Sequence, residues 1–209
     1  MNGMDKDGMN TRIAVLASGR GSNFQAVIDA IRDGRVPAAC VLLITDNPEA
    51  YAIERARAAD IAVRVVDYAT FPSHEAYERV LLSAMQGCRA DLFVLAGYMR
   101  IVGSEIVRAF SGRIINIHPA LLPSFPGLHG QRQAILHGVK VAGCTVHFVD
   151  ESLDGGPIIV QKCISVLEGD DEEALAARIL TQEHRCLPEA IRLFCEDRLV
   201  IEGRRVRIR

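Results

Sequence analysis

The stretch IINIHPALLP, residues 114–123, joins an apolar strand to two polar side chains at the strand's end. Strand side chains alternate between two faces, so Asn116 and His118 point the same way. Pro119 disfavours the helical conformation at His118, so the strand ends there. Open α/β sheets bind ligands at the carboxyl ends of their strands. A histidine can exchange a proton near neutral pH, and an amide can donate to a developing oxyanion. The stretch predicts a catalytic strand end, and its alternative is a polar pair that merely satisfies nearby backbone.

Apolar strands and amphipathic helices alternate on both sides of this stretch, which is typical of βαβ units and a parallel sheet. The segment between residues 149 and 157 is too short for a crossover helix, so its two strands should be antiparallel. We predict a single-domain, doubly wound, Rossmann-like α/β fold: a mostly parallel sheet, mixed at one edge, with helices on both faces. Strands are expected at 12–17, 39–45, 62–66, 91–96, 114–118, 141–149 and 157–166, and as two short strands within 198–209. Helices are expected at 24–32, 50–59, 71–86, 104–110, 131–137 and 174–195, the last with a break near Pro188.

Composition narrows the class of protein. The chain has 209 residues, 49% of them hydrophobic, and a formal net charge of −2, which argues against a chain-wide nucleic-acid surface. Its six cysteines form no C-x-x-C pair, and no apolar run approaches the ~20 residues that span a bilayer. We therefore predict a cytoplasmic protein with no nucleic-acid or membrane partner. Residues 1–10 are polar and are expected to be a disordered extension, with Met9 as a possible true start, before a single domain at 11–209.

A glycine-rich turn, residues 18–23 (SGRGSN), links the first strand to the first helix. Backbone N–H groups at a helix N-terminus attract anions. The dinucleotide fingerprint fails because Phe24 stands at its third glycine. A site for one phosphate, with Ser22 and Asn23 as donors, and a turn without ligand remain equally open.

Other polar residues have two interpretations. Arg100, in the strand-end loop 97–102, could hold an anion, although a solvated surface arginine is more common. Asp150, Glu151 and Asp154 could suggest metal ligands, but their spacing does not match a calcium loop and favours solvated turn acids. His147 is interpreted as a structural histidine, and a surface partner on its own helix is the alternative for Glu183.

Four motifs together resemble the phosphoribosylglycinamide formyltransferase family, over about residues 11–200. They are Ser18-Gly19-x-Gly21-Ser22-Asn23, Leu95-Ala96-Gly97-Tyr98-Met99-Arg100, Asn116-Ile117-His118-Pro119-x-Leu121-Leu122-Pro123, and His147-Phe148-Val149 followed by Leu153-Asp154-Gly155-Gly156-Pro157. The last two are shared with methionyl-tRNA formyltransferase and formyltetrahydrofolate hydrolase.

The resemblance implies transfer of a formyl group from 10-formyltetrahydrofolate, as co-substrate, to glycinamide ribonucleotide in de novo purine biosynthesis. It implies no metal, and a monomer or weak homodimer. The implied catalytic residues are Asn116, His118 and Asp154. The implied ribonucleotide-binding residues are Gly21, Ser22, Asn23, Leu180, Thr181, Gln182 and Glu183. The implied folate-binding residues are His74, Met99, Arg100, Ile101, Val102, Asn116, Asp150, Glu151, Ser152, Leu153 and Asp154.

Two positions depart from the family pattern. Gln131 stands where members often have a second histidine, and His74 stands where some have arginine. Two other functions remain alternatives. One is formyltetrahydrofolate hydrolase, whose members carry an extra N-terminal domain that residues 1–11 are too short to form. The other is a non-enzymatic nucleotide-binding module, which leaves the Asn116, His118 and Asp154 combination unexplained.

Overall fold

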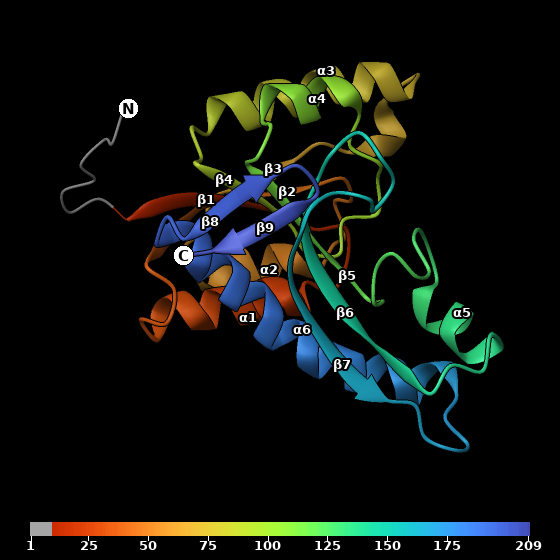
Figure 1. Cartoon of the computed structure of the whole chain (residues 1–209). Helices are drawn as coiled ribbons and strands as arrows, with labels where there is room; N and C mark the ends of the chain where they lie inside the picture. The colour runs from red at the N-terminus through yellow and green to blue at the C-terminus, as the bar shows by residue number, and fades with distance from the viewer. Residues whose placement is uncertain (1–9) are drawn as a thin grey trace.

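The computed structural model describes residues 10–209, so the extension predicted for residues 1–10 lies outside the described residues except for Asn10. Strands and helices alternate along the first half of the chain, as the sequence predicts (Figure 1). The strands are β1 (Thr11–Leu16), β2 (Ala38–Thr45), β3 (Val63–Val65), β4 (Leu92–Leu95), β5 (Ile114–His118), β6 (Val141–Phe148), β7 (Ile158–Ser165), β8 (Leu199–Glu202) and β9 (Arg205–Ile208). The helices are α1 (Ser22–Arg32), α2 (Ala52–Ala58), α3 (His74–Gly87), α4 (Ser104–Ala109), α5 (Gly130–Leu136) and α6 (Glu172–Cys195), with a 3₁₀ turn η1 (Tyr68–Thr70) before α3.

All strands belong to one sheet in the order β3-β2-β1-β4-β5-β6-β7-β9-β8. The first five strands in chain order pair in parallel, and β6 pairs antiparallel with both β5 and β7. The predicted mixed edge is therefore confirmed. The chain leaves β1 toward β2 and later returns to β4 on the other side of β1, which creates the crevice where such sheets bind ligands.

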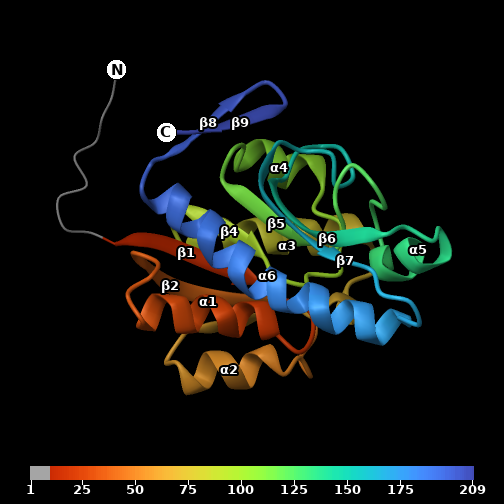
Figure 2. The same cartoon turned by 60° about the horizontal axis from the view of Figure 1, so that its bottom comes forward.

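Helices cover both faces of the sheet, and a separate apolar core lies under each layer (Figures 1 and 2). On one face α1 lies beside α6, and α2 packs next to α1. The core under these three helices includes Phe24, Ile53 and Leu187. On the other face α3 and α4 bury Tyr77 and Ile106. Strand residues alternate between the two cores, as a sheet covered on both faces requires.

Two helices begin at side-chain caps. Ser73 accepts a hydrogen bond from the Ala76 backbone N–H at 3.2 Å before α3, and Asp171 accepts one from Ala174 at 2.8 Å before α6. The break expected near Pro188 is wrong, because α6 continues through this residue. Pro188 removes one backbone donor, but it is buried, and its apolar neighbours Leu187 and Ile191 bury the same helix face against the sheet.

The connection between β6 and β7 folds back so tightly that a side chain at Gly156 would not fit. A Cβ there would lie 1.9 Å from the Phe148 carbonyl oxygen. This close approach brings Asp154, which precedes the turn, over the end of β5. Within residues 10–209, no helix has the length and apolar character needed to cross a membrane.

Candidate active site

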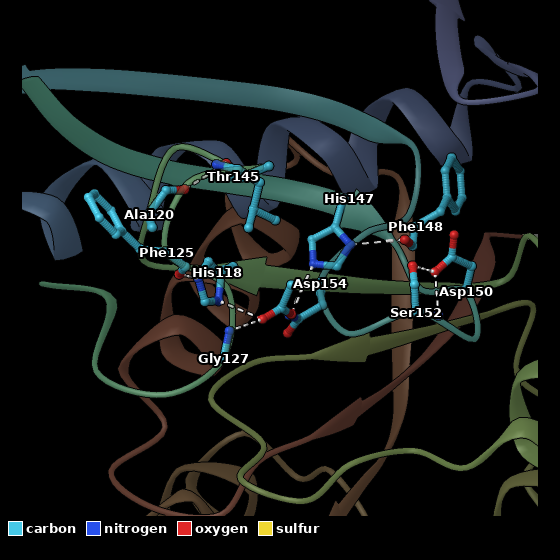
Figure 3. A network of polar contacts seen from close by, with 12 residues as sticks. His118, Ala120, Phe125, Gly127, Thr145, His147, Phe148, Asp150, Ser152 and Asp154 are labelled. Carbon is cyan, nitrogen blue, oxygen red and sulfur yellow. Dashed lines mark hydrogen bonds and ion pairs between the residues drawn. The ribbon is translucent and has the colours of Figure 1, made fainter. Parts of the chain in front are cut away.

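Asn116, His118 and Asp154 meet at the carboxyl end of β5. Figure 3 shows the contact between His118 and Asp154. The His118 Nδ1 lies 3.4 Å from the Asp154 Oδ2, and the Asn116 Nδ2 lies 3.4 Å from the Asp154 Oδ1. The other His118 nitrogen, Nε2, lies 2.8 Å from the Phe125 carbonyl oxygen, which can only accept a hydrogen bond. The structure thus brings together the three residues whose catalytic role the family resemblance implies.

Asp154 is held by donors on several sides. Its Oδ2 accepts a hydrogen bond from the Gly127 backbone N–H at 2.8 Å. Burial alone would raise the pKa of Asp154, but the contacts with His147 and Gly127 and the charges of His147 and His118 outweigh burial and lower the pKa below its ordinary value. The carboxylate is therefore the form that this site stabilises.

His147 belongs to this network, although the sequence favoured a purely structural histidine. It lies opposite Asn116 in the antiparallel pairing of β5 with β6. Its Nδ1 donates to the Phe148 carbonyl oxygen at 2.9 Å, and its Nε2 lies 3.6 Å from the Asp154 Oδ1 (Figure 3). The same Nε2 lies 3.2 Å from the Asn116 Nδ2. This contact depends on the register of β5 against β6, which places His147 opposite Asn116. The sequence carries no direct signal for that register.

The glycine-rich turn begins α1 with Gly21 at φ +67°, a left-handed conformation in which glycine is favoured. A Cβ on Gly21 would also lie 2.8 Å from the Ala52 side chain of α2. Ser22 and Asn23 are the first residues of the helix, where free backbone N–H groups face outward. The local geometry is that of an anion site, and its residues remain predicted ribonucleotide ligands.

The alternative interpretation of Glu183 as a surface residue is wrong. Glu183 is only 7% exposed, and its Oε2 accepts a hydrogen bond at 2.7 Å from the Nδ2 of Asn23. Burial raises the pKa of Glu183, and the hydrogen bond from Asn23 opposes that shift. The Asn23 Oδ1 is buried and has no hydrogen-bond partner among the residues described. The hydrogen bond between Asn23 and Glu183 therefore joins the glycine-rich turn to α6, and the Asn23 Oδ1 is left as an acceptor without a donor among the described residues.

Arg55 of α2 is a basic residue beside this turn that the sequence analysis did not select. Its Nε donates to the Arg20 carbonyl oxygen at 2.8 Å, and its Nη1 donates to the Gln25 side chain at 2.9 Å. Its positive charge contributes, after burial, to the lowered pKa of His184 on α6. The packing of α2 against α1 places this charge near the predicted phosphate site, and no local motif indicates it.

The segment after β4 presents apolar side chains beside the first turn. Met99 is 60% exposed and Ile101 is 69% exposed, whereas Val102 packs partly against the core. The Met99 backbone N–H donates to the Ser18 hydroxyl at 2.8 Å, so the segment is tied to the end of β1. Exposed apolar side chains at a fixed strand end suit a flat aromatic ligand.

Arg100 lies at the surface, with 39% of its side chain exposed, but its guanidinium is paired. Its Nε donates to the buried Asp46 Oδ2 at 2.7 Å, and its guanidinium carbon lies 4.0 Å from the centre of the Tyr68 ring. The hydrogen bond to Asp46 raises the pKa of Arg100, and burial opposes the shift. His74 lies near the same Tyr68 ring and within 3.5 Å of the Glu78 carboxylate.

The acidic loop before β7 is organised by its own contacts. Asp150 accepts a hydrogen bond from the Ser152 backbone N–H at 2.9 Å and another from the Ser152 hydroxyl (Figure 3). Glu151 forms an exposed ion pair with Arg108 at 3.3 Å, and Leu153 is 61% exposed. In the part of the chain that the structure describes, no group of three or more His, Cys, Asp and Glu residues is placed to hold a metal ion.

The other predicted ribonucleotide ligands on α6 occupy different positions around the helix. Thr181 is exposed and its hydroxyl donates to the Ala177 carbonyl oxygen at 3.2 Å, while Leu180 and Gln182 are half-buried. Leu180 lies one turn before Glu183 on the same side of the helix, whereas Thr181 and Gln182 point in other directions. Of the four residues, Glu183 is the one that bonds to the glycine-rich turn. Their roles remain predictions.

The fold and this strand-end site are those of a formyl-group transferase, and the chain belongs to the formyl transferase family, whose profile matches residues 11–191. It is similar to the crystal structure of glycinamide ribonucleotide transformylase 1 from Symbiobacterium toebii, with 54% identity and a TM-score of 0.94, over 99% of this chain and 98% of that chain.

Two curated relatives extend the comparison. Phosphoribosylglycinamide formyltransferase from Escherichia coli (strain K12) is 43% identical over 187 residues, which are 90% of this chain and 88% of that protein. The trifunctional purine biosynthetic protein adenosine-3 from Drosophila pseudoobscura pseudoobscura is 48% identical over 190 residues, but this chain spans only 14% of its length.

Proposed function

We propose that this protein transfers the formyl group of 10-formyltetrahydrofolate to the amine of glycinamide ribonucleotide. The products are formylglycinamide ribonucleotide and tetrahydrofolate, a step of de novo purine biosynthesis. The observation that carries the proposal is the meeting of Asn116, His118 and Asp154 at one strand end, on a chain of the formyl transferase family.

The reaction begins when the substrate amine attacks the formyl carbon, and negative charge develops on the formyl oxygen. The His118 Nε2 lies 2.8 Å from the Phe125 carbonyl oxygen, and its Nδ1 lies 3.4 Å from the Asp154 carboxylate, so the ring is held at the strand end. The ring and an Asn116 N–H can stabilise the oxyanion, and one such donor contributes roughly 3 kcal/mol. The long contact of 3.4 Å between Asn116 and Asp154 leaves that N–H available to a better acceptor.

Asp154 supports the same step through its charge. The pKa of Asp154 is lowered in the folded protein, and its negative charge lies 3.4 Å from the His118 Nδ1, where it orients the ring. It can also hold a water that carries a proton from the attacking nitrogen to the leaving N10 of the folate. The bond from the formyl carbon to the substrate amine forms as its bond to N10 breaks, so the formyl group passes directly between the two substrates without a covalent enzyme intermediate.

The two substrates would approach from neighbouring strand ends. The phosphate of the ribonucleotide suits the helix N-terminus at Gly21–Asn23, and the unused Asn23 oxygen beside Glu183 can accept from its hydroxyl or amine donors. The folate ring suits the exposed apolar side chains of Met99, Ile101 and Leu153. Location in the cytoplasm and a monomer or weak homodimer stay predictions, the latter measurable by sedimentation.

The experiment measures tetrahydrofolate release from 10-formyltetrahydrofolate, with and without glycinamide ribonucleotide. We expect release only with the ribonucleotide, and a fall of about 10²–10³ in kcat for His118→Gln, which removes the imidazole that stabilises the oxyanion. Glu202→Gln, in the C-terminal hairpin where the carboxylate forms an exposed ion pair with Arg207, serves as the control and should keep wild-type kcat. Release without the acceptor would instead establish a hydrolase, and no release in either mixture would favour a binding module.

A further inference from the structure

The backbone of the loop that follows His118, residues 119–127, supplies contacts to the catalytic side chains. The Phe125 carbonyl oxygen accepts from the His118 Nε2 at 2.8 Å, and the Gly127 N–H donates to the Asp154 Oδ2 at 2.8 Å (Figure 3). A shift of this loop would therefore move both a histidine and a carboxylate out of their present geometry.

Thr145 of β6 holds the start of this loop. It is fully buried and lies opposite His118 in the antiparallel register. Its hydroxyl donates to the Ala120 carbonyl oxygen at 2.7 Å and accepts from the Leu122 backbone N–H at 3.0 Å (Figure 3 shows the former). Gln161 of β7 adds to the same contact, with its Nε2 3.0 Å from the Thr145 hydroxyl and 2.8 Å from the Leu122 carbonyl oxygen.

Packing holds the other side of the loop only weakly. A cavity of about 110 Å³ lies between loop residues 119–125 on one side and Ala134 and Ala142 on the other. Side chains that line a cavity lack dispersion contacts there, so packing restrains the loop weakly on that side. Phe125 also has φ +57°, a left-handed conformation that a non-glycine residue keeps only when its surroundings impose it. The hydrogen bonds from Thr145 and Gln161 are thus the polar constraint on the loop start, beside the burial of Ala120 and Leu122.

We propose that Thr145 is a positioning residue for the reaction. Its hydroxyl, which donates and accepts at once, fixes Ala120 and Leu122 so that the downstream Phe125 carbonyl and Gly127 N–H hold His118 and Asp154. This proposal rests on the proposed formyl transfer and adds a residue that touches neither substrate. Valine has the shape of threonine but neither donates nor accepts, whereas serine keeps the hydroxyl.

The test compares Thr145→Val with Thr145→Ser in steady-state formyl transfer. We expect Thr145→Val to lower kcat by about 10- to 100-fold, because small misplacements of catalytic groups have effects of that size. KM for each substrate should stay within about 3-fold, and Thr145→Ser should recover kcat to within about 3-fold of wild type. Thr45→Val is the matched control: Thr45 of β2 is equally buried, and its hydroxyl contacts the Asn47 backbone N–H and carbonyl at 3.3 and 3.2 Å. It should lower thermal stability without changing kcat.

A second measurement does not depend on turnover. Nitrogen NMR of the histidine side chains, with the His118 signals assigned by their loss in His118→Gln, reports the Nε2 contact directly. Thr145→Val should shift the His118 signals, and Thr45→Val should not. Unchanged His118 signals, or wild-type kcat in folded Thr145→Val, would overturn the proposal. A wild-type protein without turnover would refute the proposed function, while the NMR comparison would still decide whether Thr145 holds the loop.

Discussion

Asp154 links more of the site than any other single side chain described above. Its two oxygens contact Asn116 and His147 on one side and His118 and the Gly127 N–H on the other. Its own backbone has φ +50°, a left-handed conformation that aspartate adopts more readily than most non-glycine residues. Because each contact favours the carboxylate, the charge of Asp154 contributes to folding as well as to the proposed chemistry.

We predict that Asp154→Asn weakens folding in a pH-dependent manner. The pKa of Asp154 lies below its ordinary value of 3.8 in the folded protein. Its stabilisation is therefore present above that value and is lost as pH falls through the folded-state pKa. At pH 7 the variant should have a free energy of unfolding lower by about 1.5–3 kcal/mol, a typical loss for charged hydrogen bonds, and the difference should stay constant down to about pH 4 and shrink below it.

Urea denaturation between pH 3 and pH 7 measures this difference. Asp33→Asn is the control, because its carboxylate forms only exposed ion pairs with Arg32 and Arg35, and it should change stability by less than about 0.5 kcal/mol. A constant difference between Asp154→Asn and wild type at every pH would contradict the prediction.

His147 should act on catalysis through Asn116. Its Nδ1 donates to the Phe148 carbonyl, and its Nε2 lies 3.2 Å from the Asn116 Nδ2, so the ring is fixed against the amide and holds its orientation toward the reacting atoms. We predict that His147→Gln lowers kcat by about 10-fold or more with little change in KM, because the amide loses its fixed orientation. Steady-state kinetics check this, and wild-type kcat in the folded variant would return His147 to a structural role.

At the scale of elements, α6 links the C-terminal part of the chain to the glycine-rich turn near its N-terminal end. Its 24 residues run beneath the sheet beside α1, and Glu183 lies near the middle of the helix. There it bonds to Asn23, which is 160 residues earlier in the sequence. A long helix is rigid enough to hold this carboxylate against the first turn of α1, but the burial that results raises the pKa of Glu183.

We predict that Glu183→Gln stabilises the protein and weakens ribonucleotide binding. A carboxylate with a raised folded-state pKa contributes stability that is present below its unfolded-state pKa and lost as pH rises. The glutamine amide does not ionise, so the free energy of unfolding of the variant should exceed that of wild type by about 1 kcal/mol at pH 8, with a smaller gain toward pH 5. KM for glycinamide ribonucleotide should rise about 10-fold. Urea denaturation and kinetics measure both, and a loss of stability at pH 8 would contradict the prediction.

At the scale of the whole molecule, the catalytic strand ends and the C-terminal hairpin are only loosely coupled. The hairpin of β8 and β9 joins the sheet through a single register pair, Ile158 with Arg205, and follows the part of the chain that matches the family. Leu199 and Val206 pack partly against the core. By contrast, the neighbouring strand pairs β1–β2, β1–β4, β4–β5, β5–β6 and β6–β7 are each joined along three or more residues.

We predict that deletion of residues 198–209 keeps kcat/KM within about 3-fold of wild type and lowers Tm by about 3–8 °C. Deletion exposes the partly buried apolar surface under Leu199 and Val206, which should lower the free energy of unfolding by about 1–2 kcal/mol. In a chain of this size that loss corresponds to the stated fall in Tm. Differential scanning calorimetry and the formyl-transfer assay measure the two quantities. A large fall in kcat/KM with a small change in Tm would show that the hairpin reaches the active site.

Much of this architecture follows from short-range patterns. The alternation of apolar runs and helical periods predicts the α/β class, and Pro119 marks the end of β5 because it restricts the residue before it. The pairing of Asn116 with His118 follows from the two-residue period of a strand. Pro188 misleads the same kind of reasoning, because a local preference against helix yields to the burial of apolar neighbours that the sequence does not locate.

The sequence by itself determined the elements, the mixed edge of the sheet and the polar residues at its strand ends, because these depend on periodicity and on the stereochemistry of neighbouring residues. Only the tertiary structure decided that Glu183 reaches Asn23, that His147 faces Asn116, and that Asp46 holds Arg100. Each of these contacts joins residues from separate elements. Their distances depend on strand register and on how helices pack against the sheet, which are set by burial summed over the whole core.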